Sequence, residues 1–373
     1  MNKRIILVGE KKKTDFTEIL QRNYTVEWRG DIDRKEDNVY YYIIMSEIVT
    51  LSGIQRDKMI KAGIPAGDIL EYCYFIQDPS RSNVEIFQTE RIYNEYDGFW
   101  FGMSHSYSGL HEELIRGKKI YKFSAPSMDL FYHYQTLKYL EKIYDFQKIQ
   151  NIYFELPYYC FNYDISMCPD IFLQRINFFY FFQEFHHFDE TEKGRYQIYN
   201  FRKLNELTFH FFYKNYLMID NKIINSSSKY HFDRFKKKLY YTLQSKKAHY
   251  WTYEEKTKVN QLHPHVWYKK HENTIYENTV IWRNILQLLQ KYEWINVQVV
   301  VFPFCPYFIN SHKKVITERK HEFIDNIILP SNRVVDMFET LENSPELFGD
   351  ECHLNSRGAY CFTKILERKL NEK

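Results

Sequence analysis

Residues 98–106 read Gly-Phe-Trp-Phe-Gly-Met-Ser-His-Ser. The apolar run that opens this stretch is typical of a buried strand, and Gly102 permits the backbone to turn sharply after it. Ser104 then stands at the carboxyl end of a strand, which is where parallel α/β proteins build their sites. A helix that follows would aim its first N–H groups at Ser104 and stabilise an oxyanion there. The same pattern also fits a serine that caps the helix, so a catalytic role needs a second motif.

Strands alternate with helices on the carboxyl side of this stretch. Apolar segments indicate strands at 119–123, 152–156 and 297–302 and near 333–337, and helical patterns occupy 128–144 and 356–370. This alternation predicts a three-layer α/β domain with a parallel sheet. Residues 171–290 interrupt it with an aromatic, polar and mostly helical pattern. We interpret them as an inserted helical subdomain that contributes aromatic side chains to a cleft, or else as a peripheral packing or dimerisation element.

A smaller α/β unit precedes the stretch. Strands are expected at 3–9, 24–28, 39–45 and 69–75, with helices at 16–20 and 52–62. A linker at 77–83 that contains proline and serine separates this unit from the rest, so we predict domains at 1–80 and 84–373. Gly9 stands alone where a dinucleotide-binding fold would carry its glycine-rich loop. We therefore expect no nucleotide cofactor.

The composition excludes several classes of protein. The chain is 44% hydrophobic with a formal net charge of +3, which favours globular cores and argues against nucleic acid as a partner. The 33 Tyr and 30 Phe fit either an AT-rich coding sequence or an aromatic groove for sugar rings or acyl chains. The amino-terminal apolar run is too short for a signal peptide. No stretch reaches the roughly 18 uncharged apolar residues of a membrane helix, so we expect no membrane span and a cytoplasmic location.

The six cysteines form neither a Cys-x-x-Cys pair nor a zinc-ligand spacing. In a reducing compartment we expect them to be free thiols. The sequence therefore predicts no metal site, and it leaves the oligomeric state open.

A second motif stands near the other end of the chain, where residues 350–355 read Asp-Glu-Cys-His-Leu-Asn before a predicted helix. In such a loop Asp350 lies three residues before His353, so its carboxylate can accept the Nδ1–H of the imidazole. That hydrogen bond leaves Nε2 to take a proton from a serine. The alternative is that Asp350 caps the final turn and His353 only packs.

Together, the early Gly-x-Ser after a strand and the late Asp-x-x-His-Leu-Asn resemble the first and last sequence blocks of the SGNH (GDSL-like) hydrolase family. The resemblance spans about residues 95–373 around the insertion. It is closest to the branch with a Gly-x-Ser-His-Ser first block, which is associated with modification of polysaccharides and teichoic-type polymers. It implies a flavodoxin-like hydrolase domain in which Ser104 is the nucleophile, His353 the base and Asp350 its orienting acid.

The same resemblance implies acyl-ester chemistry, by an esterase or an O-acyltransferase, on a cell-surface glycan or its precursor. The segment 61–70 in turn resembles the Rossmann-like modules attached to enzymes of surface-sugar biosynthesis. The first domain is thus expected to be a small Rossmann-like module.

The chain departs from the family pattern at Met103, because family members usually have aspartate between the glycine and the serine. The blocks that supply the oxyanion hole are also less clear. Ser127 stands where the first would lie and Asn162 follows the strand of the second, and each is either an oxyanion donor or an ordinary turn residue. These departures keep open a second hypothesis, a catalytically degenerate binding or assembly module in surface-polysaccharide biosynthesis.

Three other side chains in the two motifs could also take part in catalysis. Ser106 stands two positions after Ser104, and we expect it to cap the following helix rather than act as the nucleophile. His105 is expected to line the cleft or to pack against Trp100. Cys352 is expected to point away from the adjacent histidine, because neighbouring residues on an extended loop face opposite ways.

Overall fold

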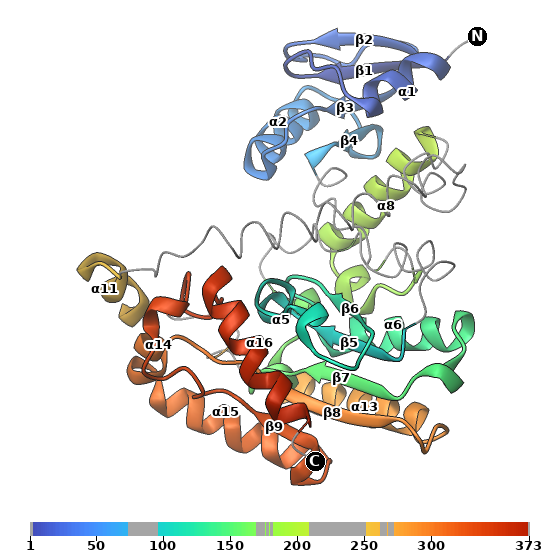
Figure 1. Ribbon diagram of the computed structural model, residues 1–373. Helices are drawn as coiled ribbons and strands as arrows, with labels where there is room; N and C mark the ends of the chain where they lie inside the picture. The colour runs from blue at the N-terminus through green and yellow to red at the C-terminus, as the bar shows by residue number, and fades with distance from the viewer. Residues whose placement is uncertain are drawn as a thin grey trace. The chain divides into compact units, whose positions relative to one another are not determined.

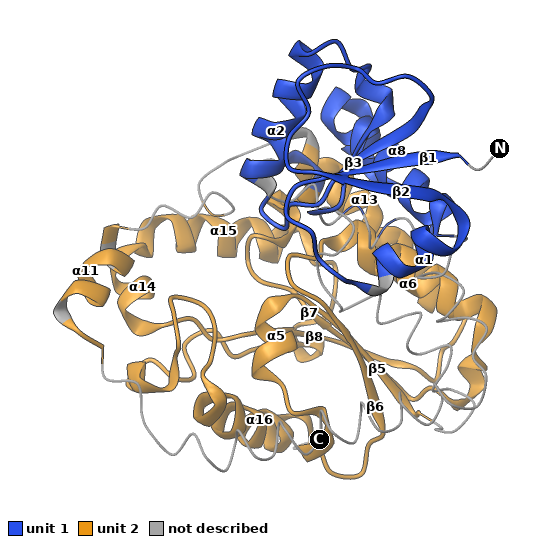
Figure 2. Cartoon of the chain, turned by 90° about the horizontal axis from the view of Figure 1, so that it is seen from above, with its two compact units in different colours: residues 1–81, 166–220 blue, residues 82–165, 221–373 orange. Residues whose placement is uncertain are grey.

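The computed structural model describes residues 3–73, 96–168, 182–208, 251–261 and 272–371, together with the single residues 176, 179 and 267. The chain forms two compact units, which Figure 2 shows in different colours. Unit 1 comprises residues 1–81 and 166–220, and unit 2 comprises residues 82–165 and 221–373. Each unit is built on its own parallel sheet.

Unit 1 has a four-stranded sheet in the order β2-β1-β3-β4. Its elements are β1 (Arg4–Val8), α1 (Asp15–Asn23), β2 (Thr25–Arg29), β3 (Val39–Ile44), α2 (Val49–Lys61), η1 (Ala66–Asp68), β4 (Ile69–Glu71), η7 (His186–Glu190) and α8 (Glu192–Leu207). Side chains alternate between the faces of β1. Leu7 therefore packs in a cluster with Phe16 of α1, and Val8 packs in a second cluster with Met59 of α2. Unit 1 has the parallel α/β architecture that the alternation of segments predicted.

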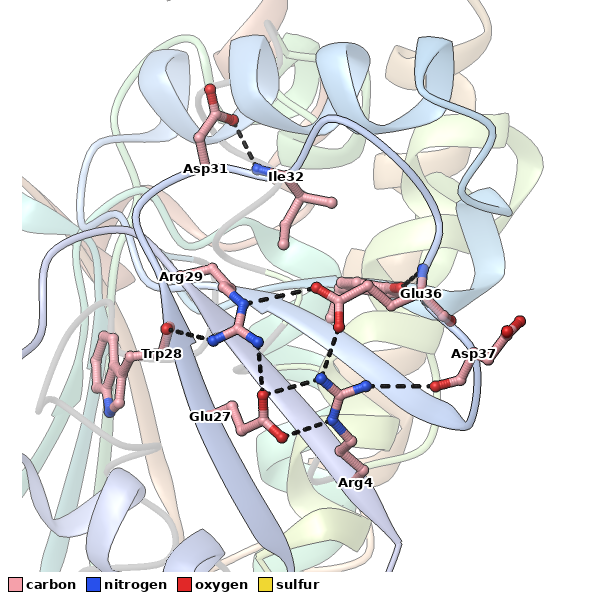
Figure 3. Close-up of polar contacts among 9 residues, drawn as sticks. Arg4, Glu27, Trp28, Arg29, Asp31, Ile32, Glu36 and Asp37 are labelled. Atoms are coloured by element: carbon pink, nitrogen blue, oxygen red, sulfur yellow. Dashed lines mark hydrogen bonds and ion pairs between the residues drawn. The ribbon is translucent and has the colours of Figure 1, made fainter.

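A network of ion pairs fixes the edge strand β2 of this sheet (Figure 3). Arg4 on β1 donates to the Glu27 carboxylate on β2 at 2.7 and 2.9 Å and to Glu36 at 2.6 Å. Arg29 donates to the same Glu27 carboxylate at 2.8 Å. Such partly exposed pairs add little to stability one by one. Together they hold the loop after β2 against the sheet.

Helix α8 belongs to unit 1, whereas the sequence analysis assigned it to the insertion at 171–290 of the second domain. The side-chain amide of Asn200 accepts the Glu71 N–H at 2.7 Å and donates to the Glu71 carbonyl oxygen at 3.0 Å. The helix thus satisfies backbone groups of the edge strand β4, a long-range contact that no local sequence pattern reports. The predicted linker at 77–83 and residues 209–250 of the predicted insertion lie outside the described residues.

Unit 2 has a five-stranded sheet in the order β6-β5-β7-β8-β9, with every pair parallel. The strands are β5 (Gly98–Gly102), β6 (Ile120–Ser124), β7 (Asn151–Glu155), β8 (Asn296–Val301) and β9 (Val334–Asp336). This is the order of flavodoxin-like doubly wound sheets, and the winding direction changes between β5 and β7. Ligands bind at such switch points, outside the carboxyl ends of the strands.

Helices cover both faces of the unit 2 sheet. Its helical elements are α5 (Ser104–Gly109), η2 (Glu112–Leu114), α6 (Leu130–Ile143), η3 (Phe146–Lys148), η4 (Cys160–Asn162), η5 (Ile165–Met167), α11 (Tyr253–Gln261), α13 (Glu272–Leu289), α14 (Pro306–Ser311), α15 (Lys313–Asn326), η8 (Ser331–Arg333), η9 (Pro345–Leu347) and α16 (Ser356–Asn371). Only the first residue of η5, Ile165, belongs to unit 2, because residues 166–220 belong to unit 1. None of the helices in the described part of the chain is both long and apolar enough to cross a bilayer.

Aromatic side chains fill the core between these layers. Phe101 on β5 stacks on Phe154 of β7 with ring centroids 5.0 Å apart, and Phe154 meets Trp282 of α13 edge-on at 5.3 Å. On the opposite face, Phe302 after β8 packs against Phe362 of α16 at 4.6 Å. Figure 1 shows α6 and α13 on one side of the sheet and α5 and α16 on the other. Unit 2 is therefore a three-layer α/β unit, as the sequence predicted.

Candidate active site

The candidate site lies at the carboxyl ends of β5 and β7, at the switch point of the unit 2 sheet. Strand β5 ends at Gly102, and α5 begins at Ser104. The helix has no side-chain cap, because Met103 stands at its N-cap position. The nucleophile candidate therefore sits at the first position of a short helix that follows a strand directly.

The structure brings together the three residues that the two motifs indicated. Ser104 Oγ lies 2.7 Å from His353 Nε2. On the other side of the ring, His353 Nδ1 lies 2.8 Å from Asp350 Oδ2 and 3.0 Å from Oδ1. The side chains of His353 and Asp350 are 32% and 47% exposed. A serine hydroxyl, an imidazole and a carboxylate thus form one chain of hydrogen bonds that solvent and substrate can reach.

The loop that carries Asp350 and His353 is held by its own hydrogen bonds. Asp350 Oδ1 accepts the N–H groups of Cys352 and His353 at 2.9 and 2.7 Å, which fixes the carboxylate beside the ring. Asn355 then accepts the N–H of Gly358 at 3.0 Å at the start of α16. A Cβ on Gly358 would overlap a backbone carbonyl oxygen of the preceding turn. The Asp-x-x-His-Leu-Asn sequence and the later glycine therefore encode the shape of this loop.

The charges of this pair support each other. Burial lowers the pKa of His353, but the hydrogen bond and the negative charge of Asp350 outweigh it and raise that pKa above its ordinary value, with smaller contributions from Glu351 and Glu155. For Asp350, burial raises the pKa, but the hydrogen bond and charge of His353 and the two backbone N–H groups lower it to about 2. The carboxylate is therefore ionised at neutral pH and stabilises a protonated imidazole.

Cys352 does not point away from His353, so that prediction is wrong. Its Sγ lies 3.3 Å from His353 Nδ1, because the turn closed by Asp350 folds the loop back on itself. Burial and the nearby charges of Asp350 and Glu351 raise the pKa of the Cys352 thiol well above its ordinary value. The thiol remains protonated at neutral pH and is a poor nucleophile.

Glu155 is the residue of this site that the sequence analysis missed. It ends β7 and is fully buried beneath the turn that carries the serine. Its Oε2 accepts the Met103 N–H at 2.7 Å, the Ser106 N–H at 3.0 Å and the Ser106 hydroxyl at 2.5 Å. Its Oε1 lies 2.7 Å from His105 Nδ1. A single acidic residue at the end of an apolar strand carries no local signal for such a role.

The same contacts place the two residues that follow Ser104. Ser106 is fully buried and hydrogen bonds with Ser124 Oγ at 2.6 Å as well as with Glu155, so it does not cap α5 as predicted. His105 is also buried, and its ring lies against His353 with centroids 5.5 Å apart and against Phe304 at 5.1 Å. The sequence left His105 either to line the cleft or to pack against Trp100, and these contacts place its ring beside His353.

The structure does not bring the two candidate oxyanion donors to Ser104 by any hydrogen bond among the described residues. The Asn162 amide nitrogen donates to Glu322 at 2.8 Å, and the Ser127 carbonyl oxygen accepts the Tyr163 hydroxyl at 2.9 Å. The N–H groups of residues 103 and 106 donate to the buried carboxylate, so they do not bind a substrate oxygen. The oxyanion roles of Ser127 and Asn162 remain predictions.

One group of side chains at the site has the spacing of metal ligands. His105, Cys352 and His353 each offer a ligand atom, and these atoms lie within 4.8 Å of one another. However, both ring nitrogens of His353 and one of His105 already take part in hydrogen bonds with the serine and the two carboxyl groups. The arrangement suits proton transfer, and we assign no metal to it.

Comparison with protein-family models, with curated proteins and with solved structures finds no match to this chain.

Proposed function

We propose that this protein is a serine-dependent acyl-ester enzyme of the SGNH type, either an esterase or an O-acyltransferase. The observation that carries the proposal is the continuous chain of hydrogen bonds from Ser104 through His353 to Asp350. Its position at the switch point of a flavodoxin-like sheet supports the same conclusion. The order of the three residues in the chain, serine first and Asp-x-x-His last, is the one that the resemblance implies.

Each group has a defined role in the reaction. Ser104 Oγ attacks the ester carbonyl carbon while its proton passes to His353 Nε2, and the carbonyl oxygen takes the negative charge. Asp350 stabilises the imidazolium, which then protonates the leaving alkoxide as the ester C–O bond breaks. The acyl group stays on Ser104 until water or a sugar hydroxyl, deprotonated by His353, attacks it and releases the serine.

The substrate class rests on the resemblance to enzymes that modify surface polysaccharides. We therefore propose an acyl ester of a cell-surface glycan or its precursor as the substrate, handled in the cytoplasm. Attack by water makes the protein an esterase, and attack by a glycan hydroxyl makes it an O-acyltransferase. Both outcomes use the same three side chains.

A fluorophosphonate probe tests the nucleophile directly, because it labels only an activated serine. We expect the wild-type protein to be labelled and Ser104→Ala not to be, with kcat/KM for a simple aryl acetate reduced at least about 10³-fold. The matched control is Ser108→Ala, because Ser108 is an exposed serine of the same helix. This variant should be labelled like the wild type.

Two outcomes would reject the proposal. Labelling that persists in Ser104→Ala would place the nucleophile elsewhere. Absence of labelling in a folded wild-type protein is the result expected of the alternative, a degenerate binding or assembly module.

A further inference from the structure

Glu155 is an ionised carboxylate enclosed in the core of unit 2. Burial raises its pKa, but the charge of His105 and the hydrogen bonds from His105, Ser106 and the Met103 N–H lower it below the usual value. A buried charge is costly unless it is paired and hydrogen bonded. Every oxygen of this carboxylate has such a partner, and all of these partners lie in the stretch that carries Ser104.

The first connection from Glu155 to the reacting groups runs through the backbone. Met103 and Ser106 flank the nucleophile on its two sides, and their N–H groups donate to the same oxygen atom. This double anchor fixes the backbone between them and thereby the direction of the Ser104 Cα–Cβ bond. Gly102 allows the close approach, because a Cβ there would lie 2.6 Å from Glu155 Oε2.

The second connection runs through an imidazole. Glu155 holds His105 at Nδ1, and the His105 ring is stacked on His353 at an interplanar angle of 24°. The carboxylate thus orients the surface against which the catalytic base lies. Its negative charge also contributes to the raised pKa of His353.

We infer that Glu155 is a positioning residue of the proposed reaction: it fixes the Ser104 turn and, through His105, the ring of His353. This inference rests on the proposed function. It assigns to the end of β7 a role that the two sequence motifs do not contain.

The test compares Glu155→Gln, which keeps the shape and removes the charge, with Glu155→Asp, which keeps the charge. We expect Glu155→Gln to remain folded and to lose about 10- to 100-fold in kcat/KM and in the rate of fluorophosphonate labelling, as the loss of hydrogen bonds to a charged group implies. The acid limb of kcat/KM should move to lower pH. Glu155→Asp should restore the limb although its rate stays reduced.

A matched control is Glu71→Gln, because Glu71 is a buried carboxylate at the end of β4 in unit 1, where it accepts a hydrogen bond from Ser52. We expect it to leave the labelling rate and the acid limb unchanged. If Glu155→Gln does not fold, His105→Asn takes its place, since an amide can still donate to the carboxylate while the stacked ring is removed. That variant should show the same loss of rate.

The titration of the His353 imidazole provides a measurement that does not depend on turnover. The ionisable groups near the His353 ring are Asp350, Glu351 and Cys352 on its own loop, His105 on α5 and Glu155 on β7. Glu155 also interacts with the buried His133 of α6. The NMR titration of the His353 ring, assigned with His353→Asn, should show a lower pKa in Glu155→Gln than in the wild type.

Unchanged titration together with unchanged labelling in folded Glu155→Gln would overturn the inference while leaving the proposed function intact. The wild-type protein could fail to be labelled although Glu155→Gln lowers the pKa of His353. That result would reject the proposed function and keep the positioning role. Equal losses in Glu155→Gln and Glu71→Gln would mean a general structural effect and would also overturn the inference.

Discussion

The pair of Asp350 and His353 sets the pH dependence of the proposed reaction. His353 must be neutral to accept the serine proton, and its pKa in the folded protein is raised above the ordinary value of about 6.5. Activity should therefore be low below that raised pKa and climb as pH passes through it. In Asp350→Asn the charge that stabilises the imidazolium is lost, so the acid limb should move to lower pH. Measurement of kcat/KM from about pH 5 to 9 reports these groups in the free enzyme.

Asp31→Asn is the control for this prediction, because the pKa of Asp31 is also lowered to about 2, mainly by its hydrogen bond with Lys58. Asp31 belongs to unit 1 and should leave the limb in place. If the acid limb of kcat/KM in Asp350→Asn were the same as in the wild type, Asp350 would be only a structural cap of the loop.

Residues differ in how far the sequence reveals them. Ser104 could be predicted as a site residue because an apolar strand and a glycine precede it. His353 could be predicted because Asp350, three residues earlier in the same loop, can accept a hydrogen bond from its ring. Glu155 could not, because its partners lie 49 to 52 residues away in the chain and only the pairing of β5 with β7 brings them together. The oxyanion roles of Asn162 and Ser127 were predicted only from the positions of the family's sequence blocks. No local feature of the sequence distinguishes these two residues from ordinary turn residues.

The turn between β5 and α5 depends on the absence of a side chain at Gly102. A Cβ at this position would overlap Ser106 Oγ and lie 2.6 Å from Glu155 Oε2 and 2.9 Å from Ser124 Oγ. We expect Gly102→Ala to lower the free energy of unfolding by about 3 kcal/mol through overpacking and to abolish fluorophosphonate labelling. Urea unfolding and the labelling rate measure the two effects.

Gly53 provides the contrast within a helix. A Cβ there would meet nothing within 4 Å, so Gly53→Ala should stabilise α2 by about 1 kcal/mol. If Gly102→Ala were tolerated as well as Gly53→Ala, the close packing of the turn on the carboxylate would be refuted.

Elements with a strong local pattern were the best predicted. The strand expected at 152–156 is observed as Asn151–Glu155, and the helix expected at 128–144 as Leu130–Ile143. The predicted assignment of α8 to an insertion differs from the observed grouping, because the helix packs on β4 through Asn200, 129 residues from its partner. Periodicity reports which face of a helix is buried, but it does not report which sheet that face covers.

One contribution to the pH dependence of stability comes from His133 on α6. This side chain is buried with neither ring nitrogen hydrogen bonded among the described residues, and burial lowers its pKa to about 4. In the unfolded chain His133 is protonated below about pH 6.5, whereas in the folded protein it is protonated only below about pH 4. The free energy of unfolding should therefore fall by about 3 kcal/mol between pH 7 and pH 4 on account of this group.

His133→Leu removes the titrating ring at similar size and should flatten this part of the pH profile. Urea unfolding of the wild type and of His133→Leu at several pH values gives the difference between their free energies of unfolding. The raised pKa of His353 adds stability at low pH in both proteins, so its contribution cancels in this difference. Parallel profiles would show that His133 does not remain neutral in the folded state.

The hydrogen bond between Ser104 and His353 joins residues that are 249 positions apart in the chain. At a synthesis rate of roughly 5–20 residues per second, the ribosome adds the histidine roughly 12–50 s after the serine. During that interval the serine has been translated without the histidine, so the nascent chain lacks the base of the proposed reaction. The order of translation thus delays the onset of the proposed activity until residue 353 has been added.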